Sequence, residues 1–342
     1  ISFLGALLAV FENSLLLQSR FILIDSFLVL FGLSGILFYL AGKNQKTEKR
    51  KSAALLLSGL FLGASVSVKW TGLIFLFTVF LMAIASLSSH MMSKKQKIKP
   101  LIKFSVFLIL IPFFFYMIVF ALHFATVPYS GAGDAFMSPG FQSTLQGNRN
   151  YNNSTGMDFL KKFAELNSVM LSANSGIKAT HPYSINWYAM PFMYRAIYYW
   201  NKAEGSLNSR IYLIGNPFVW WAVLASIILL LGGLIRNLIK RNWKELRQKR
   251  ILIFLLTAYF LNIFTYTAIS RVIFLYHYFP SLVLGIIIFC LVSGKFFEKK
   301  NKLYLAFIGL IIFGFLFFSP LTYGLPLDTK IYNLLNWLPG WI

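Results

Sequence analysis

Acidic residues and cysteine are scarce in this sequence of 342 residues. It has 10 Asp and Glu against 32 Lys and Arg, a formal net charge of +22, yet charged residues make up only 12% of the chain. A nucleic-acid-binding protein with that charge would be far more polar, so nucleic acid is excluded as a partner. The single cysteine, Cys290, excludes an intrachain disulfide.

Motifs of soluble catalysis are absent as well. The sequence contains no GxGxxG, P-loop, HExxH or nucleophile-elbow pattern. His181 and His277 have no second His, Cys or carboxylate at the spacing of metal ligands. We therefore expect neither a metal site nor a bound cofactor.

Long apolar runs dominate what is present. Hydrophobic residues make up 58% of the chain, and the mean hydropathy is +0.68. Runs of roughly 17–25 apolar residues are long enough to cross a membrane as helices, so we predict an all-α polytopic membrane protein. The first run begins without a Met or a basic segment before it, which indicates an N-terminally truncated fragment rather than a signal peptide. The nine predicted spans lie near residues 1–18, 22–41, 53–68, 71–88, 101–123, 217–236, 251–268, 275–294 and 303–319.

Four short basic connectors carry 21 of the 32 Lys and Arg. They follow the second, fourth, sixth and eighth spans, so they share one side of the membrane, which the positive-inside rule makes the cytoplasm. We therefore expect a multi-pass protein of the plasma membrane whose site faces outside. The connectors are residues 42–52, 88–103, 236–250 and 295–302.

The spans and connectors predict four parts of the chain. An external subdomain and an external tail alternate with two groups of spans. Within the subdomain we expect a helix near 157–171, and we expect the aromatic run 187–200 to lie partly on the membrane. A tight turn is expected at residues 12–20, after the first span. The four parts are residues 1–123 (spans 1–5), 124–216 (external subdomain), 217–319 (spans 6–9) and 320–342 (external tail).

Single charges at the outer ends of the spans are the candidate site residues, because ionisable groups are costly there. Arg20, Lys69 and Arg271 could together hold a phosphate group. The alternative is that they snorkel to the interface beside aromatic residues. Asp25 is expected to pair with Arg20 or Lys69. Glu12 is a candidate to bind a hydroxyl group or to act as a base.

Five motifs, in order along the chain, resemble those of the bacterial members of the protein O-mannosyltransferase family, which is of the GT-C type. They are residues 11–26 (FENSLLLQSRFILIDS), which resemble N-x-L-x-x-QSR-x-x-x-x-DS; residues 67–72 (SVKWTG); the external-loop residues 181–191 and 214–221; residues 270–280 (SRVIFLYHYFP); and the tail residues 324–326 (GLP) and 337–341 (WLPGW). The resemblance extends over essentially the whole chain.

The resemblance implies a GT-C-type helix bundle that moves mannose from a polyprenyl- or dolichyl-phosphate-mannose donor to Ser and Thr hydroxyls of exported polypeptides. It also implies that Arg20 and Lys69, together with Arg271, bind the lipid phosphate. The catalytic acidic pair of the family is expected upstream of residue 1, so the catalytic base is unknown in this chain. Supporting or substrate-binding candidates are Glu12, Gln18, Asp25, Trp70, His181, Tyr183, Trp187, Tyr276 and His277.

Three alternatives stay open. A GT-C transferase could use another sugar, or a lipid or glycan acceptor. A membrane transporter or flippase would instead place polar residues and broken helices in mid-span. The chain could also be an inactive fragment or a scaffold for a partner subunit.

Overall fold

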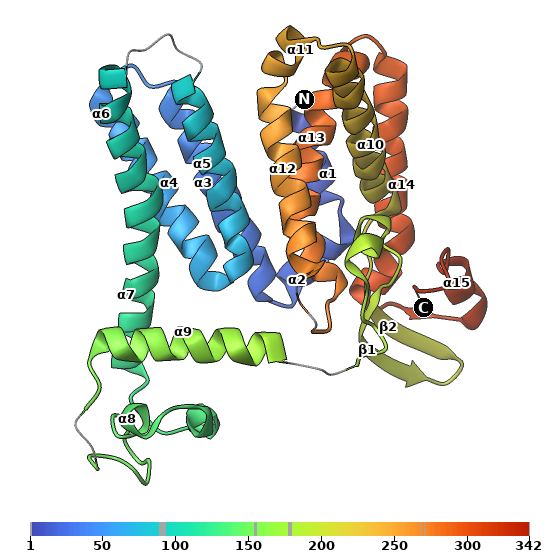
Figure 1. Ribbon diagram of the computed structural model, residues 1–342. Coiled ribbons are helices and arrows are strands. Elements are labelled where there is room, and N and C mark those ends of the chain that lie inside the picture. Colours follow the sequence, from blue (N-terminus) through green and yellow to red (C-terminus); the bar gives the residue numbers. More distant parts are fainter. Residues whose placement is uncertain are drawn as a thin grey trace.

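A computed structural model shows a helical bundle with an elaborated outer end (Figure 1). Among the described residues, eight helices are long and apolar enough to cross a membrane, or nine when a bent N-terminal pair counts as one span. The expected all-α polytopic architecture is therefore confirmed. The structure describes residues 2–88, 94–153, 156–176, 180–267, 269 and 271–341.

The first span is broken rather than continuous. Helix α1 (Ser2–Val10) and helix α2 (Asn13–Arg20) meet at an angle of 60°. The side chain of Glu12 accepts a hydrogen bond from the backbone N–H of Leu15 and so starts a new helix. The expected tight turn at residues 12–20 was wrong, because this cap makes the segment helical.

The following four spans form the N-terminal part of the bundle. Two hydroxyls of α4, on Ser58 and Ser65, donate to the carbonyls of Gly35 and Leu28 on α3. Such contacts join helices where lipid provides no hydrophobic drive. The elements are α3 (Ile24–Lys43), α4 (Glu48–Val68), the 3-10 turn η1 (Trp70–Gly72), α5 (Leu73–Ser88), α6 (Lys94–Ser105), the π-helical η2 (Val106–Leu110) and α7 (Ile111–Thr126).

The segment between α7 and the next span contains both helices and strands. The expected helix near 157–171 is confirmed as α9, whereas the β-hairpin was not foreseen. Residues 187–200, expected to lie partly on the membrane, contain η4 and the start of β1. The elements are η3 (Ala132–Phe136), α8 (Pro139–Gln142), α9 (Phe159–Gly176), η4 (Trp187–Phe192), β1 (Ile197–Glu204) and β2 (Leu207–Leu213).

The C-terminal part packs around the span Leu275–Gly294, which contains η6 and most of α13 and has 78% of the residues in its apolar stretch buried. A short strand, β3, completes an antiparallel sheet of order β1-β2-β3 by pairing its Leu327 with Asn208 and its Pro326 with Ser209. The elements are α10 (Pro217–Ile239), α11 (Trp243–Gln248), α12 (Arg250–Phe264), η5 (Thr265–Thr267), η6 (Leu275–Tyr278), α13 (Phe279–Glu298), α14 (Asn301–Tyr323), β3 (Pro326–Leu327) and α15 (Thr329–Leu334).

The two ends of the bundle carry different elements (Figure 1). The α3–α4 turn, the start of α6, α11 and the α13–α14 turn lie at one end, whereas α8, α9, the hairpin and α15 lie at the other. The basic connectors are thus at the first end, because they include these turns. We call the second end the loop end.

Glycines let α4 approach its neighbours closely. A Cβ atom on Gly59 would lie 2.1 Å from the carbonyl oxygen of Phe107, and one on Gly63 would lie 3.0 Å from the Cα of Pro112. By contrast, a Cβ atom on Gly233 of α10 would meet nothing within 4 Å. The contact between α4 and the span that contains η2 and α7 therefore requires a residue without a side chain at position 59.

We predict that Gly59→Ala lowers the free energy of unfolding by about 1–3 kcal/mol, because the methyl group forces the two helices apart. The matched variant Gly233→Ala should be neutral or slightly stabilising. Thermal unfolding in detergent can be followed by dye labelling of Cys290, which is only 6% exposed in the folded state. Equal stability of the two variants would contradict this packing.

Candidate functional site

Lys69 lies at the loop end, between α4 and η1, where its extended backbone interrupts the helical path. Its Nζ is 2.9 Å from Oδ1 of Asp25, the second residue of α3. The side chains of Lys69 and Asp25 are 22% and 7% exposed, respectively. The structure therefore selects Lys69 rather than Arg20 as the partner of Asp25. The pairing lowers the cost of keeping both charges out of water.

Two aromatic residues of η6 approach this ion pair. Nζ of Lys69 lies 4.8 Å from the ring centroid of Tyr276. The ring of His277 stacks on Tyr276, with 4.5 Å between the ring centroids. Tyr276 thus contacts both the ammonium group of Lys69 and the ring of His277, which is 3% exposed.

His277 holds Arg271 in place. Nη2 of Arg271 is 3.1 Å from Nε2 of His277. Because a guanidinium can only donate, Nε2 must be the accepting nitrogen. Nδ1 of His277 faces the backbone of Phe274, at 3.0 Å from its amide nitrogen and 3.1 Å from its carbonyl oxygen. Arg271 also donates to Oδ1 of Asn174 on α9.

Tyr199 joins α2 to the same group of residues. Its hydroxyl accepts a hydrogen bond of 2.9 Å from Nε2 of Gln18. Burial raises the pKa of the Tyr199 hydroxyl, and the nearby Tyr276 and Asp25 raise it further. This hydroxyl therefore stays protonated, so it adds a polar but uncharged group beside the Lys69–Asp25 pair.

Arg20 occupies a separate place at the loop end. Its Nη1 donates to the carbonyl oxygen of Thr322 at 2.8 Å, and its guanidinium carbon lies 4.4 Å from the ring centroid of Tyr323. Both contacts are made with the C-terminal end of α14. The structure thus gathers Lys69 and Arg271 around His277 and places Arg20 between α2 and α14.

Glu12 is fully buried and acts as a connector between α2 and α10. Its Oε2 accepts from the hydroxyl of Ser14 and the N–H of Leu15, at 2.6 and 2.7 Å. Its Oε1 accepts from the N–H of Asn216 and from Nε1 of Trp220, at 2.8 and 2.9 Å. Both oxygens are occupied by protein donors, so the geometry gives Glu12 a structural role and not that of a base or a hydroxyl ligand.

Trp70 connects the Lys69 junction to α7 and α9. Its Nε1 donates to the hydroxyl of Tyr116 at 2.8 Å, and that hydroxyl donates to Oδ1 of Asn167 at 2.6 Å. The indole is therefore a positioning group next to Lys69.

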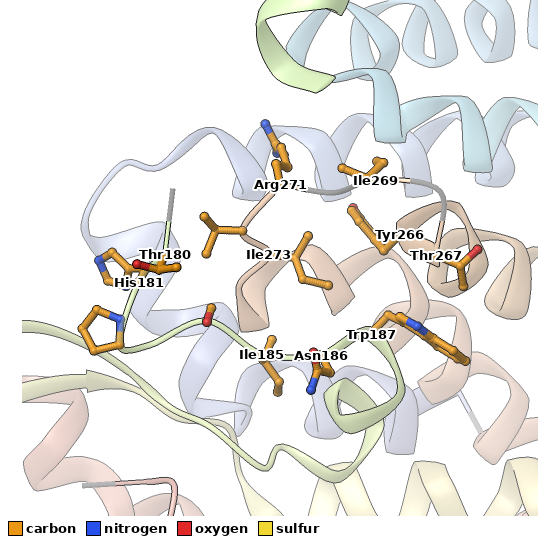
Figure 2. A pocket seen from close by; sticks show the side chains of 13 residues that line it. Thr180, His181, Ile185, Asn186, Trp187, Tyr266, Thr267, Ile269, Arg271 and Ile273 are labelled. Atoms are coloured by element: carbon orange, nitrogen blue, oxygen red, sulfur yellow. The ribbon is translucent and has the colours of Figure 1, made fainter. Parts of the chain in front are cut away.

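A pocket of about 620 Å³ opens beside Arg271, between the segments 180–187 and 266–273 (Figure 2). The N–H of Ile185 donates to the carbonyl oxygen of Ile273 at 2.9 Å, which joins the two walls. Figure 2 shows His181 on one side of these two residues and Trp187 on the other. Arg271 is common to the pocket and to the group around His277.

The three expected residues of this loop have different surroundings. The His181 ring packs edge-to-face on Phe274, and its Nδ1 accepts from the N–H of Tyr183 at 3.2 Å. Tyr183 stacks on Tyr198 of β1, with 5.9 Å between ring centroids. Trp187 packs edge-to-face against Phe264. His181 and Trp187 thus line the pocket, whereas Tyr183 packs against the sheet.

Several residues near the site were not anticipated from the sequence: Tyr116, Asn167, Asn174, Tyr199 and Tyr266. A lone Tyr or Asn in a loop or helix carries no signal of its own, and only the spacing of the two Asn residues on α9 is informative. Ser270 of the fourth motif lies outside the described residues. Among the residues that are described, no group of three or more His, Cys, Asp or Glu could hold a metal ion.

Comparison with known proteins places both halves of the site in one family. Residues 159–341 match a family model described as the C-terminal four TMM region of protein-O-mannosyltransferase. The chain belongs to the protein O-mannosyltransferase family. Residues 1–127 match the model described as dolichyl-phosphate-mannose-protein mannosyltransferase. The first match carries Arg271 and His277, and the second carries Arg20, Asp25 and Lys69.

Curated relatives agree with this assignment. The chain is 31% identical to dolichyl-phosphate-mannose–protein mannosyltransferase 1 of Saccharomyces cerevisiae over 201 residues, which are 54% of this chain and 24% of that protein. It is 31% identical to protein O-mannosyl-transferase 1 of Mus musculus over 151 residues, 42% of this chain and 20% of that protein. The matched part thus spans a quarter or less of these relatives.

A solved structure shares the fold. It is described as a protein O-mannosyltransferase complex of S. cerevisiae bound to the sugar donor. The TM-score is 0.88 at 19% identity, over 99% of this chain and 76% of that chain. The GT-C-type bundle expected from the sequence is therefore confirmed.

We predict that Glu12→Ala strongly destabilises the protein, because each buried donor left without an acceptor costs about 1–3 kcal/mol. Glu12→Gln, which keeps one accepting oxygen, should lower the free energy of unfolding by less than Glu12→Ala does. Glu298→Ala, at an exposed residue near the end of α13, should change the free energy of unfolding by less than about 0.5 kcal/mol. Unfolding measured through Cys290 labelling tests the series. Full stability of Glu12→Ala would contradict the structural role.

Proposed function

We propose that this protein transfers mannose from a polyprenyl-phosphate-mannose lipid to Ser and Thr hydroxyls of exported polypeptides. The observation that carries the proposal is the meeting of Lys69, Asp25, His277 and Arg271 at the loop end, from two segments that each match the family. The names of the relatives supply the donor class, dolichyl-phosphate-mannose. The acceptor comes from the family resemblance of the motifs.

The chemistry requires positive charge where the lipid phosphate leaves. The acceptor hydroxyl attacks the anomeric carbon and loses its proton, while the bond to the phosphate oxygen breaks and negative charge grows on the phosphate. Lys69 and Arg271 stabilise that charge in a site with little water, where such contacts count for more than in bulk solvent. Arg20 approaches the lipid phosphate from the α2–α14 side. The proton of the hydroxyl passes to the catalytic carboxylate pair that the family resemblance implies, to which no residue of this chain is assigned.

Asp25 and His277 prepare the two cations. Asp25 holds the ammonium group of Lys69 at 2.9 Å, so the flexible lysine stem loses little further freedom when the donor binds. His277 holds the guanidinium of Arg271 through its accepting Nε2. We assign Asp25 and His277 positioning roles. The ring of Tyr276 faces the ammonium group of Lys69.

We propose a plasma-membrane location with the basic connectors in the cytoplasm and the loop end outside. The support is the charge asymmetry between the ends of the bundle. We further propose that residues 124–216 and 320–342 form one external unit on the two groups of spans. The pairing of β3 with β2 supports this arrangement, because it ties the tail to the external segment.

We predict that the double variant Lys69→Met/Asp25→Asn loses at least about 100-fold in mannose transfer, since a preorganised charge is removed from the leaving phosphate. Removing both partners avoids leaving a buried carboxylate alone. The assay compares membranes from cells that express the native gene or its variant. It supplies radiolabelled polyprenyl-phosphate-mannose as the donor and a Ser/Thr peptide as the acceptor.

The matched control is Lys103→Met/Glu48→Gln, which removes the ion pairs of Glu48 with Lys103 at 3.1 Å and with Lys51 at 2.9 Å, within the basic connectors. It should leave transfer unchanged. Equal activity of the two double variants would contradict the proposed role of Lys69. Transfer of glucose or another sugar, but not mannose, by the wild-type membranes would overturn the donor assignment.

Arg20→Ala should lower turnover by about 100-fold without loss of inserted protein. Arg210→Ala is a close control, because Arg210 makes the same kind of contact with Tyr332, also at 4.4 Å from the ring centroid. Arg210 lies on β2, so its loss should leave turnover near that of the wild type. Unchanged mannosylation by Arg20→Ala would remove Arg20 from the proposed phosphate site.

A further inference from the structure

Helix α9 lies across the loop end, transverse to the spanning helices (Figure 1). It starts beside the end of α7 and runs toward the β-hairpin. Neither the motifs nor the proposed chemistry explains why a helix of 18 residues crosses this end of the bundle.

The N-terminal half of α9 is firmly attached to α7. The ring of Phe163 packs edge-to-face on Tyr116 and Phe120, with centroid distances of 5.8 and 5.2 Å. The carboxylate of Glu165 accepts from the N–H and the hydroxyl of Ser138, at 2.6 and 2.8 Å. This half therefore has a defined position relative to the N-terminal spans.

One contact from this half leads to Lys69. Oδ1 of Asn167 accepts from the hydroxyl of Tyr116, which in turn accepts from Nε1 of Trp70. Trp70 directly follows Lys69 in the chain, at the point where the backbone leaves α4. Asn167 thus ends a hydrogen-bonded chain that holds the Lys69 junction.

The C-terminal end of α9 leads to Arg271. Residues 171–176 are all exposed, yet Asn174 accepts a hydrogen bond from the guanidinium of Arg271. The carbonyl end of a helix carries partial negative charge, which further favours a cation there. Arg271 is held by His277 on its other side.

The two asparagines are seven residues apart, which places them on the same face of α9 and about 10 Å apart along its axis. One leads to Lys69 on the N-terminal spans, and the other binds Arg271 on the C-terminal part. Arg271 lies 3.1 Å from Nε2 of His277, and Tyr276 contacts both His277 and Lys69. The spacing of the asparagines therefore matches a site that has one cation on each side.

We propose that α9 is a strap that sets the distance between Lys69 and Arg271, with Asn167 and Asn174 as its positioning residues. The inference rests on the proposed function, because the ligand that needs this spacing is the phosphodiester of the lipid donor. Asn174 acts through Arg271, and Asn167 acts through Tyr116 and Trp70. Neither residue contacts the acceptor.

The test separates the Michaelis constants of donor and acceptor in membranes that carry the full protein. Asn174→Ala should raise the KM for polyprenyl-phosphate-mannose about tenfold, the effect of losing one hydrogen bond to a charged group. The KM for the acceptor peptide should not change. Asn174→Asp, which keeps an accepting oxygen, should stay within about twofold of the wild type. Asn174→Lys should raise the donor KM more than Asn174→Ala does, because it places a second cation beside Arg271.

A double-variant cycle tests the mechanism. In an Arg271→Ala background, Asn174→Ala should cause no further change in donor KM. Asn167→Ala should likewise raise the donor KM in the wild type but not in a Trp70→Phe background. Ser168→Ala, at an exposed residue of the same helix, is the control and should match the wild type.

Additive effects in the cycle, or equal changes in both KM values, would overturn the strap, because they would indicate general loss of structure. Cys290 labelling shows whether each variant is folded. Wild-type membranes that transfer no mannose would instead contradict the proposed function. The two failures are therefore distinguishable.

Discussion

The buried carboxylate of Glu12 is the interaction on which the rest of the arrangement depends. Its two oxygens accept four hydrogen bonds, which start α2 and tie it to the first residues of α10. A Cβ atom on Gly215 would lie 2.6 Å from Oε1 of Glu12, so the chain passes this point without a side chain. Helix α2, which starts at this point, carries Gln18 and Arg20, and Asp25 follows in the first turn of α3.

Charge at the loop end is held by partners of different kinds. Lys69 has a carboxylate, Arg271 has an imidazole and an amide, and Arg20 has a backbone carbonyl and a ring. Within the part of the chain that the structure describes, only the first of these is an ion pair, so no described carboxylate pairs with the other two cations. Such an excess suits the binding of a phosphate, because the ligand then supplies the missing negative charge.

The proposed function needs both parts of the bundle at once. The family matches divide the chain into two segments, and each contributes one cation beside His277. Helices α5 and α12 pack against each other and join the two parts within the bundle. The proposed strap, together with the Glu12 contacts, explains how the spacing across the site is maintained.

The sequence alone determined that this is a polytopic membrane protein, where its spans lie and which connectors share one side of the membrane. These features follow from the length of the apolar runs and the distribution of Lys and Arg. Its motifs also named Lys69, Asp25, Arg271 and His277. Only the tertiary structure decided that Asp25 pairs with Lys69, that Glu12 is buried, and that Asn174 meets Arg271 across 97 residues. The physical reason is that hydropathy reports whether a residue enters the membrane, whereas a partner is chosen by packing between helices far apart in the chain.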